Sequence, residues 1–309
     1  MHLTHVLQAI DLLDAPVWGR EVAPYLGERG LDVAVNPIEG DRGRTDFLLI
    51  TVPGSQGAGA GGDAPTTGIV GRLGGTGARP DVVGLVSDAD GAIAAIATAL
   101  ALARMQEKGD LLHGDVVIAT HVCPEAPTEP HDPVPFMGTP VSMEVMNREE
   151  VRPQMDAVLS IDATKGNRIV NWKGIAITPT VRQGWVLPVA PDLIDVYEQV
   201  CGVPARVLPI STYDITPYGN GLYHVNSILQ PATATDAPVV GVAVTAETAV
   251  PGSATGANHP TDLALAVTFV IEVAKRFGAG RLSLFDPGEM DQAIARYGPL
   301  QQLQGPRGG

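Results

Sequence analysis

The sequence is poor in cysteine. Cys123 and Cys201 are the two cysteines among 309 residues, and they form no Cys-x-x-Cys motif. This excludes a small fold held together by several disulfides and favours a reducing compartment. Residues 1–5 also lack the basic start and the small-residue cleavage site of a secretory signal. We therefore expect a cytoplasmic protein.

Basic residues and long hydrophobic runs are scarce as well. The chain has 20 Lys and Arg against 34 Asp and Glu, a formal net charge of −14. Nucleic-acid binding requires a basic surface, so a DNA or RNA partner is not expected. No run reaches the length of about 18 apolar residues that a membrane-spanning helix needs. Neither a nucleic acid nor a membrane is therefore an expected partner. The small-molecule or short-peptide substrate that we expect rests on the site residues described next.

Hydrophobic residues make up 45% of the chain, enough for a sizeable core, and 36 Gly with 26 Pro break it into many loops. Helical periodicity predicts helices near residues 5–30 (interrupted at Pro16), 91–107, 191–201 and 261–277. Apolar runs and alternation predict strands at 32–38, 46–52, 115–120, 157–161, 167–187, 206–211 and 238–244. Helices that alternate with buried strands predict a three-layer α/β/α fold with a mostly parallel, mixed central sheet. We expect a single domain over residues 1–300.

Two segments fall outside this pattern. Residues 53–80 are rich in glycine and are predicted to form an inserted long loop or a pair of short hairpins. The segment could suggest a phosphate cradle, but no Gly-Lys-Ser or Gly-Lys-Thr follows it, which disfavours a nucleotide site. Residues 301–309 are predicted to be a disordered tail.

Polar side chains follow nearly every predicted strand or precede the next helix. In a parallel sheet, ligands bind beyond the carboxyl ends of the strands, so these side chains are expected at one edge of the sheet. Carboxylates and imidazoles are suitable ligands for Zn²⁺, Mn²⁺ or Co²⁺. The combination of carboxylates and histidines predicts a metal site. The polar residues that follow the strands or precede the next helix are Asp88, Asp90, His121, Cys123, Glu125, Glu129, His131, Asp132, Asp162, Lys165, Asn167, Tyr213, Asp214, His224, Thr245, Glu247 and His259.

Each of these residues also has a simpler interpretation. Asp88 is a candidate helix N-cap and Asp90 a first-turn acid favoured by the helix dipole. His131 is a candidate solvated loop residue, and His259 a loop residue bonded to backbone. Cys123 is either a small buried hydrophobic residue or a nucleophile with His121 or His131 as its base.

Several phrases resemble those of a known clan. The segment Asp-Ala-Asp-Gly-Ala-Ile-Ala-Ala at 88–95 is similar to the one that supplies a bridging Asp before a small-residue helix in di-metal aminopeptidases and related zinc exopeptidases and amidohydrolases. The segments at 119–125, 160–162 and 258–263 stand, in order, where that clan has its later metal motifs. Longer phrases, such as Val-Pro-Gly-Ser-Ala-Thr-Gly-Ala-Asn-His-Pro-Thr-Asp at 250–262, resemble a bacterial and archaeal family known as domain of unknown function 1177.

The resemblance implies a zinc-exopeptidase-like fold and one or two divalent transition-metal ions (Zn²⁺, Mn²⁺ or Co²⁺). It implies Asp88 as the bridging ligand, Asp162 and His259 as further ligands, and Glu125 as a ligand or the general base. The clan's early His-x-Asp is missing at residues 49–54, and Pro124 replaces the first Glu of its Glu-Glu pair. His121 or His131 is therefore the expected substitute ligand.

The expected activity is metal-dependent hydrolysis of an amide or peptide-like small substrate by a metal-activated water. Lys165, Asn167, Tyr213 and Asn220 are candidates for orienting that substrate or stabilising an oxyanion. The alternative is a catalytically inactive relative that binds a small molecule or serves as an oligomeric structural protein. By analogy with the clan, we expect a homo-oligomer.

Overall fold

The computed structural model describes residues 2–222 and 227–305. Among these residues, nine strands form one mixed sheet in the order β1-β2-β4-β3-β7-β11-β9-β10, with β8 paired to β11. Neighbours among β4, β3, β7 and β11 are parallel, and the outer strands are antiparallel. The strands are β1 (Asp32–Gly40), β2 (Gly43–Val52), β3 (Thr67–Arg72), β4 (Val116–Val122), β7 (Ala157–Ala163), β8 (Gly174–Ile177), β9 (Thr180–Arg182), β10 (Trp185–Leu187) and β11 (Val239–Thr245). A separate hairpin pairs β5 (Thr128–Glu129) with β6 (Phe136–Met137).

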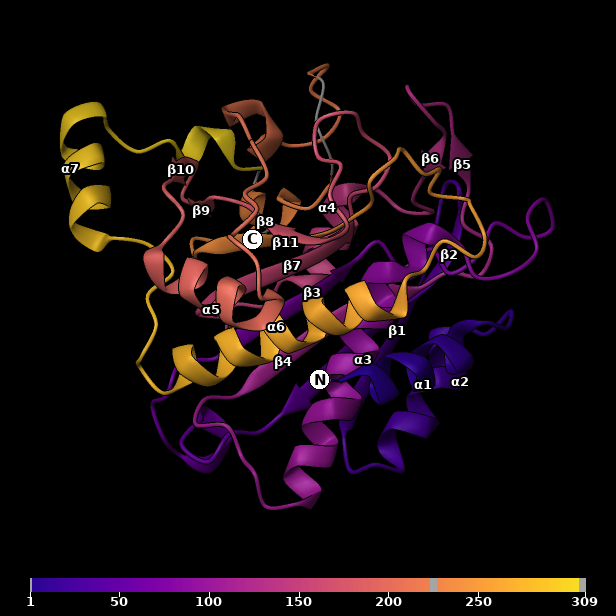
Figure 1. Ribbon diagram of the computed structural model, residues 1–309, viewed down its shortest axis with the longest axis horizontal. Helices are drawn as coiled ribbons and strands as arrows, with labels where there is room; N and C mark the ends of the chain where they lie inside the picture. The colour runs from indigo at the N-terminus through magenta and orange to yellow at the C-terminus, as the bar shows by residue number, and fades with distance from the viewer. Residues whose placement is uncertain (1, 223–226, 306–309) are drawn as a thin grey trace.

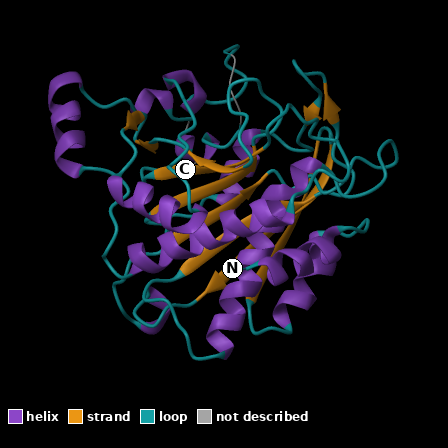
Figure 2. Cartoon of the chain, in the orientation of Figure 1, coloured by secondary structure: helices purple, strands orange, loops and turns teal. Residues whose placement is uncertain are grey.

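Helices cover both faces of the sheet unequally (Figures 1 and 2). The main core lies under α1 (Leu3–Leu13), α2 (Gly19–Gly27), α3 (Asp90–Glu107), α5 (Pro191–Cys201) and α6 (Pro260–Gly278). The opposite face is covered by α4 (Met143–Glu150), by loops and by the short 3-10 turns η3 (Thr212–Ile215) and η4 (Gln230–Thr233). A last helix, α7 (Pro287–Tyr297), stands beside β9 and β10 in Figure 1. The predicted mixed, mostly parallel sheet between helices is confirmed.

The central strand β3 lies inside the glycine-rich segment, so the prediction of a loop or two hairpins was wrong for residues 67–72. The flanking residues 53–66 and 73–80 contain only the 3-10 turn η1 (Ala58–Ala60) and isolated bridges. Gly71 of β3 is needed because a neighbouring backbone atom comes very close, and Gly68 leaves room for a neighbouring side chain. A Cβ on Gly71 would lie 2.2 Å from the Gly91 carbonyl oxygen of α3, and one on Gly68 would lie 2.4 Å from the Met155 sulfur. Glycine weakens the sequence signal for a strand, while long-range packing here requires it.

Two further predictions need correction. Residues 206–211 form no strand: Val207 makes only an isolated bridge to Ile177. Within the predicted disordered tail, residues 301–303 form the 3-10 turn η5 (Gln301–Leu303), and Gln304 is buried, donating to the carbonyl oxygens of Ala232 and Thr235. Residues 306–309 lie outside the described part of the chain. None of the described helices is long and apolar enough to cross a bilayer.

Candidate functional site

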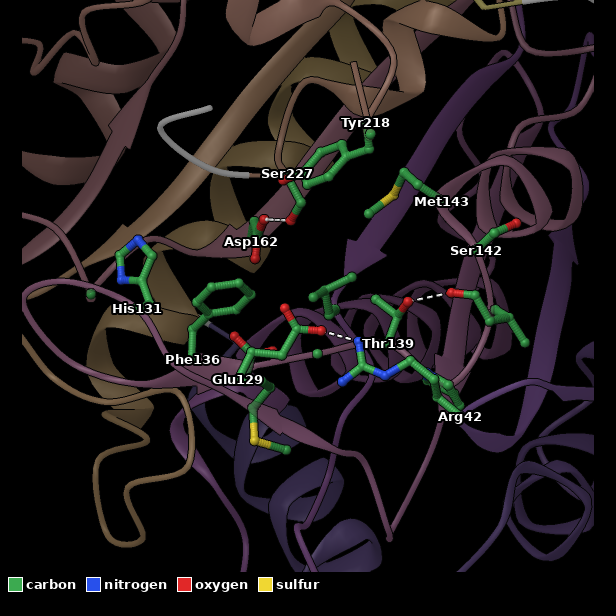
Figure 3. Close-up of a pocket in the computed structure, with 18 of the residues that line it drawn as sticks. Arg42, Glu129, His131, Phe136, Thr139, Ser142, Met143, Asp162, Tyr218 and Ser227 are labelled. Carbon is green, nitrogen blue, oxygen red and sulfur yellow. Dashed lines mark hydrogen bonds and ion pairs between the residues drawn. The ribbon is translucent and has the colours of Figure 1, made fainter. Parts of the chain in front are cut away.

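A cavity of about 730 Å³ opens at the carboxyl end of β7, beside the short turn η2 (Ser87–Ala89) that leads into α3 (Figure 3). Its position is that of ligand sites in open parallel sheets, and its size is that of a small-molecule site. Apolar side chains dominate the wall and polar groups gather at a few points. The lining includes Arg42, Leu73, Asp88, Glu129, His131, Phe136, Met137, Val141, Met143, Asp162, Asn167, Tyr218, Leu222 and Ser227.

Two carboxylates from different elements reach this cavity. Asp88, on η2, is 7% exposed, and its Oδ2 atom is buried without a hydrogen-bond partner in the structure as described. Asp162, on β7, is 3% exposed and accepts a hydrogen bond of 2.5 Å from the Ser227 hydroxyl. A buried carboxylate without a donor is costly, so Asp88 Oδ2 is a strong candidate for contact with a proton or a ligand.

The environment of the pair disfavours two negative charges. Burial raises the pKa of Asp162 to about 7, although the hydrogen bond from Ser227 and the positive charge of Arg72 act in the opposite direction. Burial and the negative charges of Asp162 and Asp90 raise the pKa of Asp88 well above its ordinary value. Both shifts favour a protonated carboxyl in the pair over two negative charges, as neighbouring carboxylates do when they share a site.

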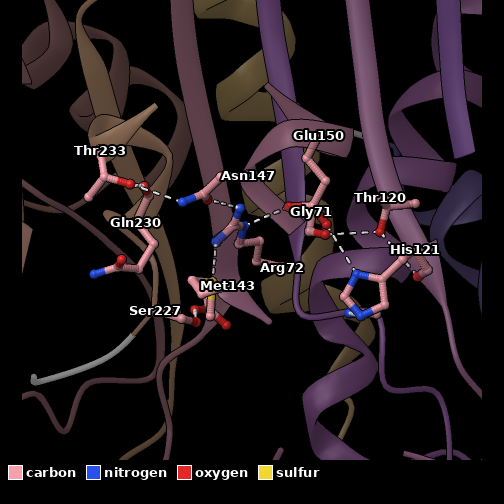
Figure 4. A network of polar contacts seen from close by, with 12 residues as sticks. Gly71, Arg72, Thr120, His121, Met143, Asn147, Glu150, Ser227, Gln230 and Thr233 are labelled. Carbon is pink, nitrogen blue, oxygen red and sulfur yellow. Dashed lines mark hydrogen bonds and ion pairs between the residues drawn. The ribbon is translucent and has the colours of Figure 1, made fainter. Parts of the chain in front are cut away.

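Arg72 supplies a fixed positive charge within a network of polar contacts (Figure 4). It is the last residue of β3 and is fully buried. Its Nε donates to Glu150 Oε2 at 2.7 Å, and its terminal nitrogens contact Asn147 Oδ1 and the Met143 sulfur. The guanidinium is thus held by α4 in a position from which its charge acts on Asp162.

His121 is part of the same network and is not free to bind a metal. The Gly74 N–H donates to its Nε2 at 3.0 Å, so the ring proton must lie on Nδ1. Nδ1 lies 3.1 Å from Glu150 Oε1 and donates to it. With both ring nitrogens engaged, His121 supports Glu150 and Arg72, and the predicted role as a substitute ligand has no lone pair available.

Lys165 forms a buried ion pair next to the carboxylates. Its ammonium pairs with Asp90 and donates to the Ala257 carbonyl oxygen at 2.7 Å. Asn258 donates to the other oxygen of Asp90 at 2.8 Å. Asp90 is the first residue of α3, as expected of a first-turn acid, and it also anchors Lys165. Lys165 does not line the cavity, so its predicted catalytic role would have to act through its neighbours.

Other predicted site residues lie away from the cavity. Glu125 and Tyr213 are exposed and do not line it. His259 lies in a second cavity at the start of α6, with its Nδ1 3.7 Å from Asp262 Oδ2. The structure therefore brings Asp88 and Asp162 together but not Glu125 or His259.

His131 does line the cavity, with its Nδ1 3.1 Å from the Val134 carbonyl oxygen and its ring edge-on to Phe136. Cys123 is fully buried, its thiol donates to the Arg44 carbonyl oxygen, and burial raises its pKa to about 11. That environment disfavours the thiolate and favours the interpretation of Cys123 as a small buried hydrophobic residue. His224 lies outside the described residues.

The donor set does not fit the zinc site implied by the clan resemblance. A zinc site takes at least three protein ligands. In the described ranges 2–222 and 227–305, no three His, Cys, Asp or Glu side chains converge in a way that could hold a metal ion. Asp88 and Asp162 provide carboxylate oxygens, but Lys165 and Arg72 supply the neighbouring positive charges.

Sequence reasoning missed Ser227, Arg72 and Tyr218. Ser227 contacts Asp162 from 65 residues further along the chain, and Arg72 ends a strand that was predicted to be a loop. Tyr218 lines the cavity where Tyr213 was expected. Burial raises its pKa, and the negative charge of Asp162 adds to the effect. None of these three residues lies in a local sequence motif that would identify it as part of a site.

Solved structures share this fold at low identity. Leucyl aminopeptidase from Leishmania major, solved with actinonin, matches with a TM-score of 0.56 and 14% identity over 88% of this chain and 61% of its own. This chain thus spans about three fifths of that enzyme. A TET aminopeptidase from a marine sediment thaumarchaeon matches with a TM-score of 0.48 and 11% identity, covering 90% of this chain and 99% of its own. A glutaminyl cyclase from an Acidobacteriales bacterium matches with a TM-score of 0.48 and 10% identity, covering 90% of this chain and 94% of its own.

The match to the leucyl aminopeptidase shows a similar fold and no more. No curated protein sequence matches the chain. One family model, described as "Protein of unknown function (DUF1177)", matches residues 36–307, most of the 309-residue chain. The chain therefore belongs to the DUF1177 family.

Proposed function

We propose that the cavity hydrolyses an amide bond in a small substrate, with Asp88 and Asp162 as its acid and base. The observation that carries the proposal is the pair itself. Two buried carboxylates from separate elements face one cavity, and one of them has an oxygen without a hydrogen-bond partner in the structure as described. Pairs of titratable groups in unlike environments mark acid and base roles.

The surroundings of each carboxylate suggest which role it takes. Asp162 receives the Ser227 hydrogen bond and lies in the field of Arg72, and both favour its charged form. Asp162 is therefore the base. Asp88 lies near the charges of Asp162 and Asp90, which favour its protonated form. Asp88 is therefore the acid.

The reaction needs no reactant other than the amide and one water molecule. Asp162 takes a proton from a water molecule, whose oxygen attacks the amide carbonyl carbon. Asp88 gives its proton to the amide nitrogen as the carbon–nitrogen bond breaks. The products are a carboxylic acid and an amine, and one proton moves from Asp162 to Asp88 to restore the starting state. The Tyr218 hydroxyl is the candidate donor to the developing oxyanion.

The metal-activated water of the expected mechanism is replaced here by carboxylate chemistry because too few ligands converge among the described residues. The reaction class remains that expected from the sequence. The aminopeptidase with the same fold is consistent with it, although fold alone does not determine activity.

The test is a panel of small amides and dipeptides assayed with and without a chelator. We expect turnover that survives chelation and falls about 10²–10⁴-fold in Asp88→Asn and in Asp162→Asn. The exposed Asp291→Asn serves as the matched control and should retain full activity.

Three outcomes would contradict the proposal. Turnover that both variants retain would remove the pair from the chemistry. Turnover that is lost on chelation and restored by Zn²⁺, Mn²⁺ or Co²⁺ would show that catalysis depends on a metal ion and not on a proton shared by the carboxylate pair. Binding of panel compounds without any turnover would favour the inactive, small-molecule-binding alternative.

A further inference from the structure

We propose that the substrate is an α-amino acid whose side chain ends in the scissile amide, and that Arg42 and Glu129 bind its zwitterionic head group. This inference names a substrate class for the function proposed above and rests on it. It concerns a part of the cavity that the hydrolytic chemistry does not use.

Arg42 and Glu129 form an ion pair in the cavity wall (Figure 3). Arg42 lies in the turn between β1 and β2, and Glu129 lies on β5. Their side chains are 47% and 32% exposed, so a ligand entering the cavity can reach both. Within the described residues, this contact is the only hydrogen bond or ion pair that either side chain makes. A guanidinium has five N–H donors, so Arg42 keeps donors for a ligand.

A zwitterionic head group can replace the Arg42–Glu129 ion pair with two ion pairs between the ligand and the protein. The carboxylate and the ammonium of an α-amino acid are attached to the same carbon, next to each other. Its carboxylate can bind Arg42 while its ammonium binds Glu129, so every charge keeps a partner. A ligand with only one of these charges would leave either Arg42 or Glu129 poorly paired. The pair therefore selects for both charges together.

The position of the pair places the reactive amide away from the head group. Figure 3 shows Asp162 and Ser227 towards one end of the cavity and Arg42 with Glu129 towards the other.

Apolar side chains line the same cavity, among them Leu73, Phe136, Val141 and Met143. An aliphatic stem would bury its methylene groups there and gain from their removal from water. The geometry thus points to an amide at the end of an aliphatic side chain rather than to a peptide bond beside the α-carbon.

The experiment measures binding by calorimetry in Asp162→Asn and turnover in the unmodified protein. The probe is Nε-acetyl-lysine. It is compared with three derivatives: one blocked at the α-amine, one blocked as the α-carboxamide, and one blocked at both. We expect each single block to weaken binding about tenfold or more, the effect of one lost charge-assisted hydrogen bond. Arg42→Gln and Glu129→Gln should weaken zwitterion binding by a similar factor, with little effect on the doubly blocked compound.

Arg104→Gln is the matched control, because Arg104 forms an exposed ion pair with Glu107 on α3 and does not line the cavity. Equal binding of all four compounds would overturn the inference. The inference would also be overturned if Arg42→Gln and Glu129→Gln lowered the melting temperature but left the relative affinities for the four compounds unchanged. The ion pair would then only stabilise the packing of the β1–β2 turn against β5. Discrimination without turnover would leave the head-group site standing and reject the hydrolase. Turnover of amides without any preference for the zwitterionic head group would support the hydrolase and reject the head-group site.

Discussion

At the scale of single residues, the carboxylates of the cavity differ in what surrounds them. Asp162 has a hydroxyl donor and a nearby guanidinium, whereas Asp88 Oδ2 has no hydrogen-bond partner in the described residues. Both lie almost fully out of water. Their unlike surroundings, more than their type, give the pair its capacity for acid–base chemistry.

This arrangement predicts that stability falls as pH rises through the acidic range. The pKa of Asp162 is raised from 3.8 to about 7 on folding, so between these values the folded state binds more protons than the unfolded state. The free energy of unfolding therefore decreases with pH in that window, with a slope from this residue of at most about 1.4 kcal/mol per pH unit. Urea titrations from about pH 4 to about pH 8, which bracket the two values, measure the slope.

Asp162→Asn should reduce the dependence of the unfolding free energy on pH. Above the folded-state pKa of Asp162, the variant should be more stable than the unmodified protein. The exposed Asp291→Asn should leave the slope unchanged. An identical slope in unmodified protein and Asp162→Asn would show that Asp162 titrates normally.

At the scale of elements, β3 and α3 depend on small residues. Residues 90–103 of α3 are all buried, and most are alanine or other small residues that let the helix lie close to the sheet. Gly71 lies against the backbone of Gly91, where the two elements come very close. The strand therefore places Arg72, and the helix places its preceding turn with Asp88, at the same end of the sheet.

Gly71→Ala should destabilise the protein because its Cβ would lie 2.2 Å from a backbone oxygen that cannot move alone. Overpacking of this kind costs about 1–3 kcal/mol. Gly27→Ala in α2 is the control, since nothing lies within 4 Å of its Cβ position. Chemical denaturation of both variants measures the difference, and equal stabilities would refute the close contact.

At the scale of the whole molecule, the cavity is assembled from segments far apart in the chain. Its wall draws on the β1–β2 turn, η2, the β5–β6 hairpin and its approach to α4, the end of β7, and residues near Tyr218 and Ser227. The last described residues support this face, since Gln304 donates to two backbone carbonyls next to η4.

Gln304→Ala should cost about 1–3 kcal/mol, because one buried and one partly buried carbonyl oxygen would lose their donor. Gln302→Ala, at an exposed position, should change stability by less than about 0.5 kcal/mol. Thermal unfolding of the two variants compares them directly. A melting temperature for Gln304→Ala equal to that of Gln302→Ala would show that the C-terminal segment does not support the fold.

The sequence by itself determined the fold class and part of the site. Helical and strand periodicity report which face of each element is buried, so α1, α2, α3, α5, α6 and most strands lie where they were predicted. Asp88 and Asp162 could be placed at one edge because parallel strands end on the same side of a sheet.

Only the tertiary structure decided the rest. It made β3 a central strand, because close packing rather than local propensity requires glycine at Gly71. It engaged both nitrogens of His121 with Glu150 and a backbone N–H, and it left Glu125 and His259 outside the cavity. It also brought Ser227 to Asp162 and Glu129 to Arg42 across 65 and 87 residues of chain. These contacts depend on how distant segments meet in space, which the local sequence pattern around each residue does not record.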